Sequence, residues 1–255
     1  MSELLWLPAE VEVWAAVAMI AASFATSLIT AAFGIGGGVM LLALLAVLLP
    51  PLALIPVHGV VQVGSNLGRT LLMLRQVRSG MILPFTFGSV LGAALGGILF
   101  VQIPPWVVQF AIGLFIIWSV LGKLPAFGRG HVFASGAFST FLTMFFGATG
   151  TFVSAMVKTL NLPPQEHVAT HSALMTIQHS LKVLAFGMLG FAFGPYLFLT
   201  AAMFLSGFIG TVAGRQILIR LGERYFKPVL SGILLLLAAR LLWSAAENFL
   251  AQPLT

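Results

Sequence analysis

The sequence predicts an all-α polytopic membrane protein that is built from two inverted-topology repeats. Of its 255 residues, 60% are hydrophobic and only 7% are charged, whereas a soluble domain carries roughly a quarter charged residues. The apolar residues form runs that approach the roughly 20 residues of a bilayer-spanning helix. These runs recur after a fixed interval, and the basic residues between them give the two copies opposite orientations. Lipid is therefore the expected solvent for almost the whole chain.

The apolar runs form two sets of about five hydrophobic segments. The first set covers residues 11–32, 38–49, 56–74, 81–101 and 105–122, and the second covers 131–147, 151–162, 168–189, 195–219 and 226–246. The second segment of each set has only about twelve residues, fewer than a span needs. The first two segments of each set therefore either both cross or form a re-entrant hairpin, and we favour the hairpin. We expect one membrane domain, residues 1–255, with repeats at 11–122 and 131–246.

An offset of 113 residues aligns the first three segments of the two sets. It pairs His58 with His171 and Arg69 with Lys182, and it pairs the glycine-rich break at 33–38 with the break at 146–151. Chance similarity between apolar segments would not align the rare polar residues. The chain is therefore interpreted as a tandem duplication.

The basic residues indicate how each half is oriented, because Lys and Arg collect in cytoplasmic loops. In the first half they follow the third and fifth segments, at Arg75, Arg78, Lys123 and Arg129. In the second half they mark the connection between the fourth and fifth segments, at Arg215, Arg220, Arg224 and Lys227. The acidic N-terminus and the uncharged connections are expected outside. These assignments agree only if each half crosses the membrane an odd number of times. The two repeats then have opposite orientations, as in many secondary transporters.

Polar side chains occupy one face of the third segment in each half. They are His58, Gln62, Ser65, Asn66 and Arg69 in the first half and His171, Met175, Gln178, His179 and Lys182 in the second. Apart from Met175, we take these residues as candidate substrate ligands, because ionisable groups inside a membrane normally face a cavity or a partner. The two faces should therefore meet. The alternative is that the two cations snorkel and that the other groups only join helices.

The glycine-rich breaks supply the remaining candidate ligands. They are Gly34, Gly36, Gly37 and Gly38 in the first break and Gly147, Thr149, Gly150 and Thr151 in the second. Glycine permits sharp turns, and a helix that begins after a break presents free N–H groups and a positive dipole to an anion. The alternative role is close helix packing. Neither break matches a nucleotide-binding motif.

The charge balance of the apolar segments favours an anionic substrate. They contain Arg69 and Lys182, whereas the acids outside the chain ends are Glu166 and Glu223, both at expected cytoplasmic edges. A cation would lack a counter-charge. A small oxyanion would find a cation from each half together with amide, hydroxyl and imidazole donors. Proton coupling, if it occurs, would use the histidines.

The duplicated break, the Pro-Pro pair that follows each copy and the histidine in the third segment resemble the TauE/SafE family of sulfite and sulfonate exporters. The resemblance spans about residues 22–242. It implies an integral, multi-pass permease of the plasma membrane, in a bacterium the inner membrane, for sulfite, sulfonates or related organosulfur anions. Together with the inverted repeats, the charge balance and the acidic N-terminus described above, the resemblance leads us to expect an exporter that works by alternating access, holds an oxyanion between its repeats and has its N-terminus outside. The second break departs from the glycine-rich pattern at Thr149 and Thr151, whose hydroxyls could still donate to an oxyanion.

Three other functions remain open from the sequence. The chain could be an anion channel, a non-transporting membrane partner or an intramembrane metallohydrolase. His167 and His171 have metal-compatible i, i+4 spacing, but Glu166 precedes the first histidine instead of following it. We expect no enzyme activity, catalytic residue, metal or cofactor, and no nucleic-acid partner, because the basic residues form no patch. The expected partners are the substrate anion and the lipid bilayer. The direction of transport, the identity of the anion and the presence of a homo-oligomer stay open.

Overall fold

The structure, a computed structural model, describes residues 7–33, 36–100, 104–122, 131–217 and 226–250. This part of the chain is all helical, with ten α-helices, three short 3-10 helices and no strand. The α-helices are α1 (Val13–Phe33), α2 (Gly37–Leu48), α3 (Pro51–Leu72), α4 (Ile82–Phe100), α5 (Pro105–Leu121), α6 (Val132–Phe146), α7 (Gly150–Lys158), α8 (Pro164–Met188), α9 (Leu197–Ile217) and α10 (Phe226–Leu250). The 3-10 helices are η1 (Leu74–Gln76), η2 (Ser79–Met81) and η3 (Gly194–Tyr196).

The helices follow the ten predicted segments closely, except at the starts of α3 and α8 and at the ends of α7 (Lys158, predicted 162) and α10 (Leu250, predicted 246). Helices α3 and α8 begin four or five residues earlier than the apolar runs, at Pro51 and Pro164. Proline is well suited to the first helical position, where its missing N–H would have no partner. Pro56, the first residue of the predicted apolar run, lies inside α3. The limits of an apolar run therefore mark a change of composition and not the end of a helix.

The helices differ in whether they are long enough to cross a membrane. Three stretches of the described chain are long and apolar enough, at Val13–Ala31, Ser79–Phe100 and Gly194–Gly214. By contrast, α2 has 12 residues and α7 has 9. At 1.5 Å per residue these two helices are about 18 and 14 Å long, less than the roughly 30 Å of the hydrocarbon core. Neither can cross by itself.

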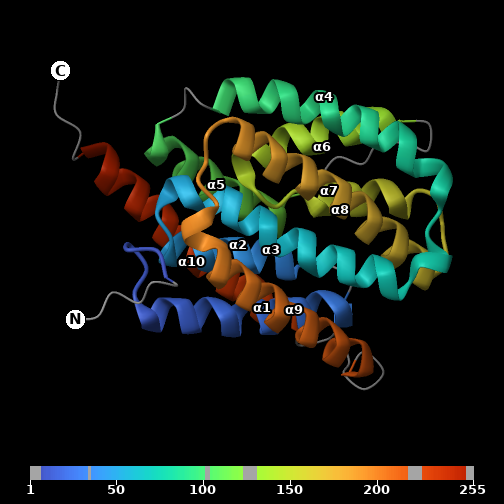
Figure 1. The fold of residues 1–255 in the computed structure, drawn as a ribbon, viewed down its shortest axis with the longest axis horizontal. Coiled ribbons are helices and arrows are strands. Elements are labelled where there is room, and N and C mark those ends of the chain that lie inside the picture. Colours follow the sequence, from blue (N-terminus) through green and yellow to red (C-terminus); the bar gives the residue numbers. More distant parts are fainter. Residues whose placement is uncertain (1–6, 34–35, 101–103, 123–130, 218–225, 251–255) are drawn as a thin grey trace.

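Two helix pairs flank a central pair. In Figure 1, α4 and α6 lie together along one side, α1 and α9 lie along the other, and α3 and α8 run between them. Glycines bring the outer pairs into backbone contact. A Cβ added at Gly92 in α4 would lie 2.2 Å from the carbonyl oxygen of Ala137, and one added at Gly210 in α9 would lie 2.2 Å from that of Phe24. Small residues permit such close approach between membrane helices.

The central helices α3 and α8 run antiparallel. His58, near the start of α3, packs edge-on against His179, in the second half of α8, with ring centroids 5.9 Å apart. At the other end of α3, Arg78 in the following loop forms an ion pair with Glu166 in the first turn of α8, with Nη2 and Oε2 2.6 Å apart. The polar faces of these two helices therefore meet, as the sequence predicted.

Helices α5 and α10 also run antiparallel. Trp106, at the start of α5, packs against Phe249, at the end of α10, with ring centroids 4.9 Å apart. One turn further along α5, Gln109 accepts a hydrogen bond from Asn248. The outer pairs, in contrast, run parallel. Along α4 and α6, Gly88 faces Phe133 and Gly92 faces Ala137, so the contacts advance in the same direction on both helices.

Apolar side chains face outward and many polar side chains face inward. Large hydrophobic side chains are exposed along α4 at Leu83, Phe87, Leu91, Leu95 and Ile98. Inside the bundle, serines, threonines, amides, histidines and two cations are buried. This distribution suits a protein that is surrounded by lipid and encloses a polar site.

Candidate functional site

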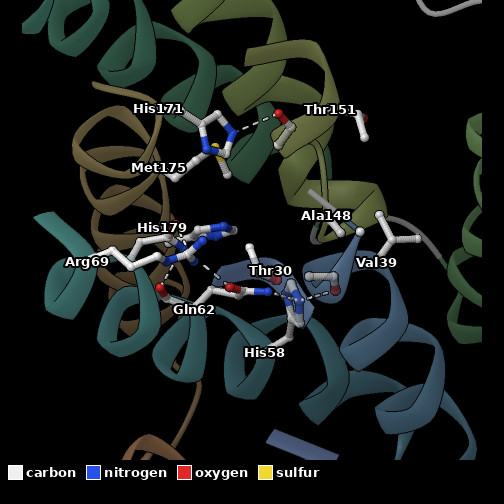
Figure 2. A pocket seen from close by; sticks show the side chains of 14 residues that line it. Thr30, Val39, His58, Gln62, Arg69, Ala148, Thr151, His171, Met175 and His179 are labelled. Carbon is white, nitrogen blue, oxygen red and sulfur yellow. Dashed lines mark hydrogen bonds between the residues drawn. The ribbon is translucent and has the colours of Figure 1, made fainter. Parts of the chain in front are cut away.

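A cavity of about 50 Å³ lies between α3, α8 and the first residues of α2 and α7 (Figure 2). One water molecule needs about 10–15 Å³ of cavity volume. The cavity therefore has room for about four water-sized groups. The predicted residues that line it are Gly36, Gly38, His58, Gln62, Asn66, Arg69, Gly150, Thr151, His171 and His179. Four further lining residues, Thr30, Val39, Ala148 and Met175, were not among the predicted ligands.

The cavity lies where the two short helices begin. The backbone of Gly36 before α2 has φ +104°, and that of Gly147 after α6 has φ +75°, a region that favours glycine. Gly37 is a packing residue, because a Cβ there would lie only 1.9 Å from the carbonyl oxygen of Thr26. The predicted ligand Gly34 lies outside the described residues.

A series of polar contacts runs along α3 from the start of α2 to Arg69. His58 Nε2–H donates to the carbonyl oxygen of Gly38 at 3.0 Å, and the amide of Gln62 lies 3.2 Å from the same ring nitrogen. Asn66 Nδ2 donates to Gln62 Oε1 at 3.3 Å, and Arg69 Nη2 donates to Asn66 Oδ1 at 3.1 Å. These contacts fix the polar wall of the cavity on α3.

The guanidinium of Arg69 is buried without a counter-charge. Its side chain is 5% exposed, and its protein contacts are to Ser65 and Asn66 in the preceding turn of α3. Its Nη1 has no hydrogen-bond partner. Among the described residues, no carboxylate lines the cavity or pairs with Arg69. A buried charge in this state is costly, and an anion in the cavity would reduce that cost.

The opposite wall comes from α8. His171 Nε2–H donates to the carbonyl oxygen of Gly150 at 3.0 Å, so His171 contacts the start of α7 as His58 contacts the start of α2. Figure 2 shows His179 beside Arg69, and Met175 beside His171. The Nδ1 atom of His179 has no hydrogen-bond partner.

Ser65, Thr149, Gln178 and Lys182 were also predicted as ligands, but they do not line the cavity. They form hydrogen bonds that hold the elements around it. Lys182 Nζ donates to the carbonyl oxygen of Gly147 at 3.0 Å. Gln178 Nε2 donates to Thr149 Oγ1 at 2.7 Å, and Thr149 Oγ1 donates to the carbonyl oxygen of Ser139 at 2.9 Å. These bonds tie α8 and the start of α7 to α6. On the other side, Ser65 holds Arg69 and lies 3.3 Å from Ser27 Oγ in α1.

The lining residues that were not predicted all lie near a break or on the polar stripe. Val39 is next to the lining residue Gly38, Ala148 lies within the second break, and Thr30 lies one turn before the first break. Met175 occupies the position in the second half that Gln62 occupies in the first. Proximity to the breaks was therefore the signal for three of them. Repeat equivalence was the signal for Met175.

The histidine pair with metal-compatible spacing does not form a metal site in the described part of the chain. His167 lies outside the cavity and contacts Ser154 Oγ at 3.2 Å, while Glu166 pairs with Arg78. No group of three or more His, Asp or Glu side chains that could hold a metal ion occurs among the described residues.

The comparisons with known proteins give one match. The family model described as "Sulfite exporter TauE/SafE" matches residues 19–241, which is most of the chain. No curated protein and no solved structure matches. The match confirms the predicted resemblance. Members of this family are membrane transporters and not enzymes, which sets aside the metallohydrolase alternative. With most of its length matched, the chain belongs to the TauE/SafE sulfite exporter family.

Proposed function

We propose that this chain exports small sulfur oxyanions, such as sulfite or short sulfonates, by alternating access, and that the anion binds in the cavity between α3 and α8. The observation that carries the proposal is Arg69, a buried guanidinium with an unpartnered Nη1 in a cavity lined by no carboxylate of the described chain. An oxyanion is the ligand that pairs best with this group.

The remaining polar groups of the cavity favour the same ligand. Two lining residues besides Arg69 carry unpartnered atoms that can donate, His179 at Nδ1 and Thr151 at Oγ1. Buried polar groups without a partner cost about 1–3 kcal/mol each, so a ligand that accepts from them gains affinity. The N-termini of α2 and α7 both border the cavity and add a positive potential. If export is coupled to protons, the proton would move through His58, His171 and His179.

We infer that the two halves are inverted repeats, residues 11–122 and 131–246. Helices at equivalent positions, α3 with α8 and α5 with α10, run antiparallel to each other. The contact between α1 and α9 has its counterpart in the contact between α6 and α4. Both features are expected when one half is the other turned upside down in the membrane. A site between inverted repeats is the usual arrangement for alternating access.

The test is transport by the purified chain in liposomes, with sulfite as the substrate. Wild type is expected to show saturable flux and counterflow. Arg69→Gln, which removes the buried charge, is expected to raise the half-saturating concentration about tenfold or more, since a hydrogen bond to a charged group contributes about 1.5–3 kcal/mol. The matched control is Arg75→Gln, which removes the same charge from an exposed position in η1 and should behave like wild type.

The outcomes separate the alternatives. Unchanged saturable flux in Arg69→Gln would refute the site. Linear flux without counterflow would indicate a channel, and the absence of flux for every sulfur anion would indicate a non-transporting partner. Right-side-out and inverted vesicles of the plasma membrane would test the proposed location and the outward direction of transport.

A further inference from the structure

One ion pair joins the two halves of the chain where α3 ends and α8 begins. Arg78, between η1 and η2, donates from Nε and Nη2 to the same oxygen of Glu166 in the first turn of α8, at 2.7 and 2.6 Å. The backbone N–H of Arg78 also donates to Thr170 Oγ1, one turn further along α8, at 3.1 Å. Three polar contacts therefore fasten a connection of the first half to a helix of the second half.

The ion pair lies close to the cavity. Glu166 precedes the cavity residue His171 by five residues of α8, which is about 7.5 Å along the helix axis. The basic residues Arg75 and Arg78 mark this end of the bundle as the expected cytoplasmic side. A path to that side from the cavity between α3 and α8 therefore runs along the elements that the ion pair joins.

The opposite end of the bundle joins the halves through apolar contacts. At the ends of α4 and α8, the rings of Phe100 and Phe186 pack edge to face with centroids 4.9 Å apart. The ion pair has no counterpart there, because the repeat offset places Phe191 and Ala53 at the equivalent positions. No other ion pair occurs in the described part of the chain. The contacts between the halves are therefore charged at one end and apolar at the other.

We infer that the Arg78–Glu166 pair is the cytoplasmic gate of the carrier, which keeps the cavity closed on that side and breaks when the cavity opens there. This inference rests on the proposed function, because in alternating access the halves move against each other and the contacts at one end separate in one of the two states. The side chains of Arg78 and Glu166 are 57% and 26% exposed, so water can solvate both charges once they part.

The gate changes the balance between the two states by a moderate factor. A partly exposed ion pair alters an equilibrium constant by up to about fivefold. Such a factor biases the carrier toward the state that is closed to the cytoplasm without preventing the change of state. Glu166→Gln removes one charge and keeps the size of the side chain, so it should shift the balance toward the state that is open to the cytoplasm.

The test measures how fast a cysteine in the cavity reacts from each side of the membrane. Val39 lines the cavity, and the chain has no cysteine of its own, so Val39→Cys is the reporter in every variant. The probe is a membrane-impermeant methanethiosulfonate reagent, applied to intact cells for the outer face and to inverted vesicles for the cytoplasmic face. Adding Glu166→Gln should raise the rate in inverted vesicles about threefold to fivefold and lower the rate in intact cells.

Two further variants show whether the charge pair itself is responsible. Arg78→Glu combined with Glu166→Arg reverses the pair and should return both rates toward those of the reporter alone. Arg75→Gln is the matched control, because it removes an exposed charge near the pair, and it should leave both rates unchanged. If Glu166→Gln does not fold, Thr170→Val removes the hydroxyl that accepts from the backbone of Arg78, and it should change the two rates in the same directions.

Opposite changes on the two faces distinguish a gate from a purely structural contact, whose loss would loosen the bundle and raise both rates. Unchanged rates in Glu166→Gln, or higher rates on both faces, would overturn the inference while the proposed function stands. If the reporter reacts from neither face in any variant, the cavity does not open to water, and the proposed function itself fails.

Discussion

Arg69 and Lys182 occupy equivalent positions in the two halves but make different contacts. Arg69 is held against its own helix by Ser65 and Asn66 and lines the cavity. At the equivalent positions α8 carries Gln178 and His179, and Gln178 is already bonded to Thr149. Lys182 therefore reaches across to the carbonyl oxygen of Gly147. The repeat offset pairs the two cations in the sequence. It does not reveal the contacts that direct Lys182 away from the cavity.

Gly147 combines a positive φ with a close contact at its Cβ position. Its φ of +75° is unfavourable for any residue with a Cβ, and a Cβ there would lie 2.7 Å from Leu42 Cδ1. We expect Gly147→Ala to lower the free energy of unfolding by about 1–3 kcal/mol and to lower the melting temperature. Gly194→Ala is the control, since nothing lies within 4 Å of its Cβ position, and it should melt like wild type. Equal melting temperatures for the two variants would contradict this account.

At the scale of helices, the outer pairs α4–α6 and α1–α9 depend on glycines for their close approach. Gly92→Ala and Gly210→Ala each place a Cβ 2.2 Å from a backbone oxygen of the facing helix. Both variants should lose about 1–3 kcal/mol of stability, measured by thermal unfolding in detergent. Gly232→Ala in α10 meets nothing within 4 Å, so it should be neutral or stabilising, because alanine favours helix over glycine. A loss of stability in Gly232→Ala as large as in the other two would show that close packing is not the cause.

Much of the helix arrangement, and part of the cavity wall, could be predicted from the sequence. Ten helices follow from ten apolar runs, and the meeting of α3 with α8 follows from their costly polar faces. The early starts of α3 and α8 did not follow, because Pro51 and Pro164 begin helices although they interrupt apolar runs. The cavity wall was predicted where polarity marked it, as at Gln62 and Arg69. It was missed at Val39, because an apolar side chain in a membrane segment carries no sign that it faces a cavity and not lipid.

At the scale of the whole molecule, the proposed inversion places equivalent positions on opposite sides of the membrane. Ser79, between α3 and α4, and Ala192, between α8 and α9, are separated by the repeat offset of 113 residues, and both are exposed. The loop before α4 also carries Arg75 and Arg78, whereas the connection from α8 to α9 is uncharged. The excess of basic residues predicts that the first loop is cytoplasmic and the second is outside.

The chain contains no cysteine, so single cysteines can report sidedness without background. In intact cells, a membrane-impermeant maleimide should label Ala192→Cys and leave Ser79→Cys unlabelled, and in inverted vesicles the pattern should reverse. A membrane-permeant maleimide should label both variants in both preparations, which controls for burial. Labelling of both variants from the same side would mean that each half crosses an even number of times. The halves would then be parallel repeats, and the rocking of one inverted half against the other, on which the proposed export mechanism depends, would lose its structural basis.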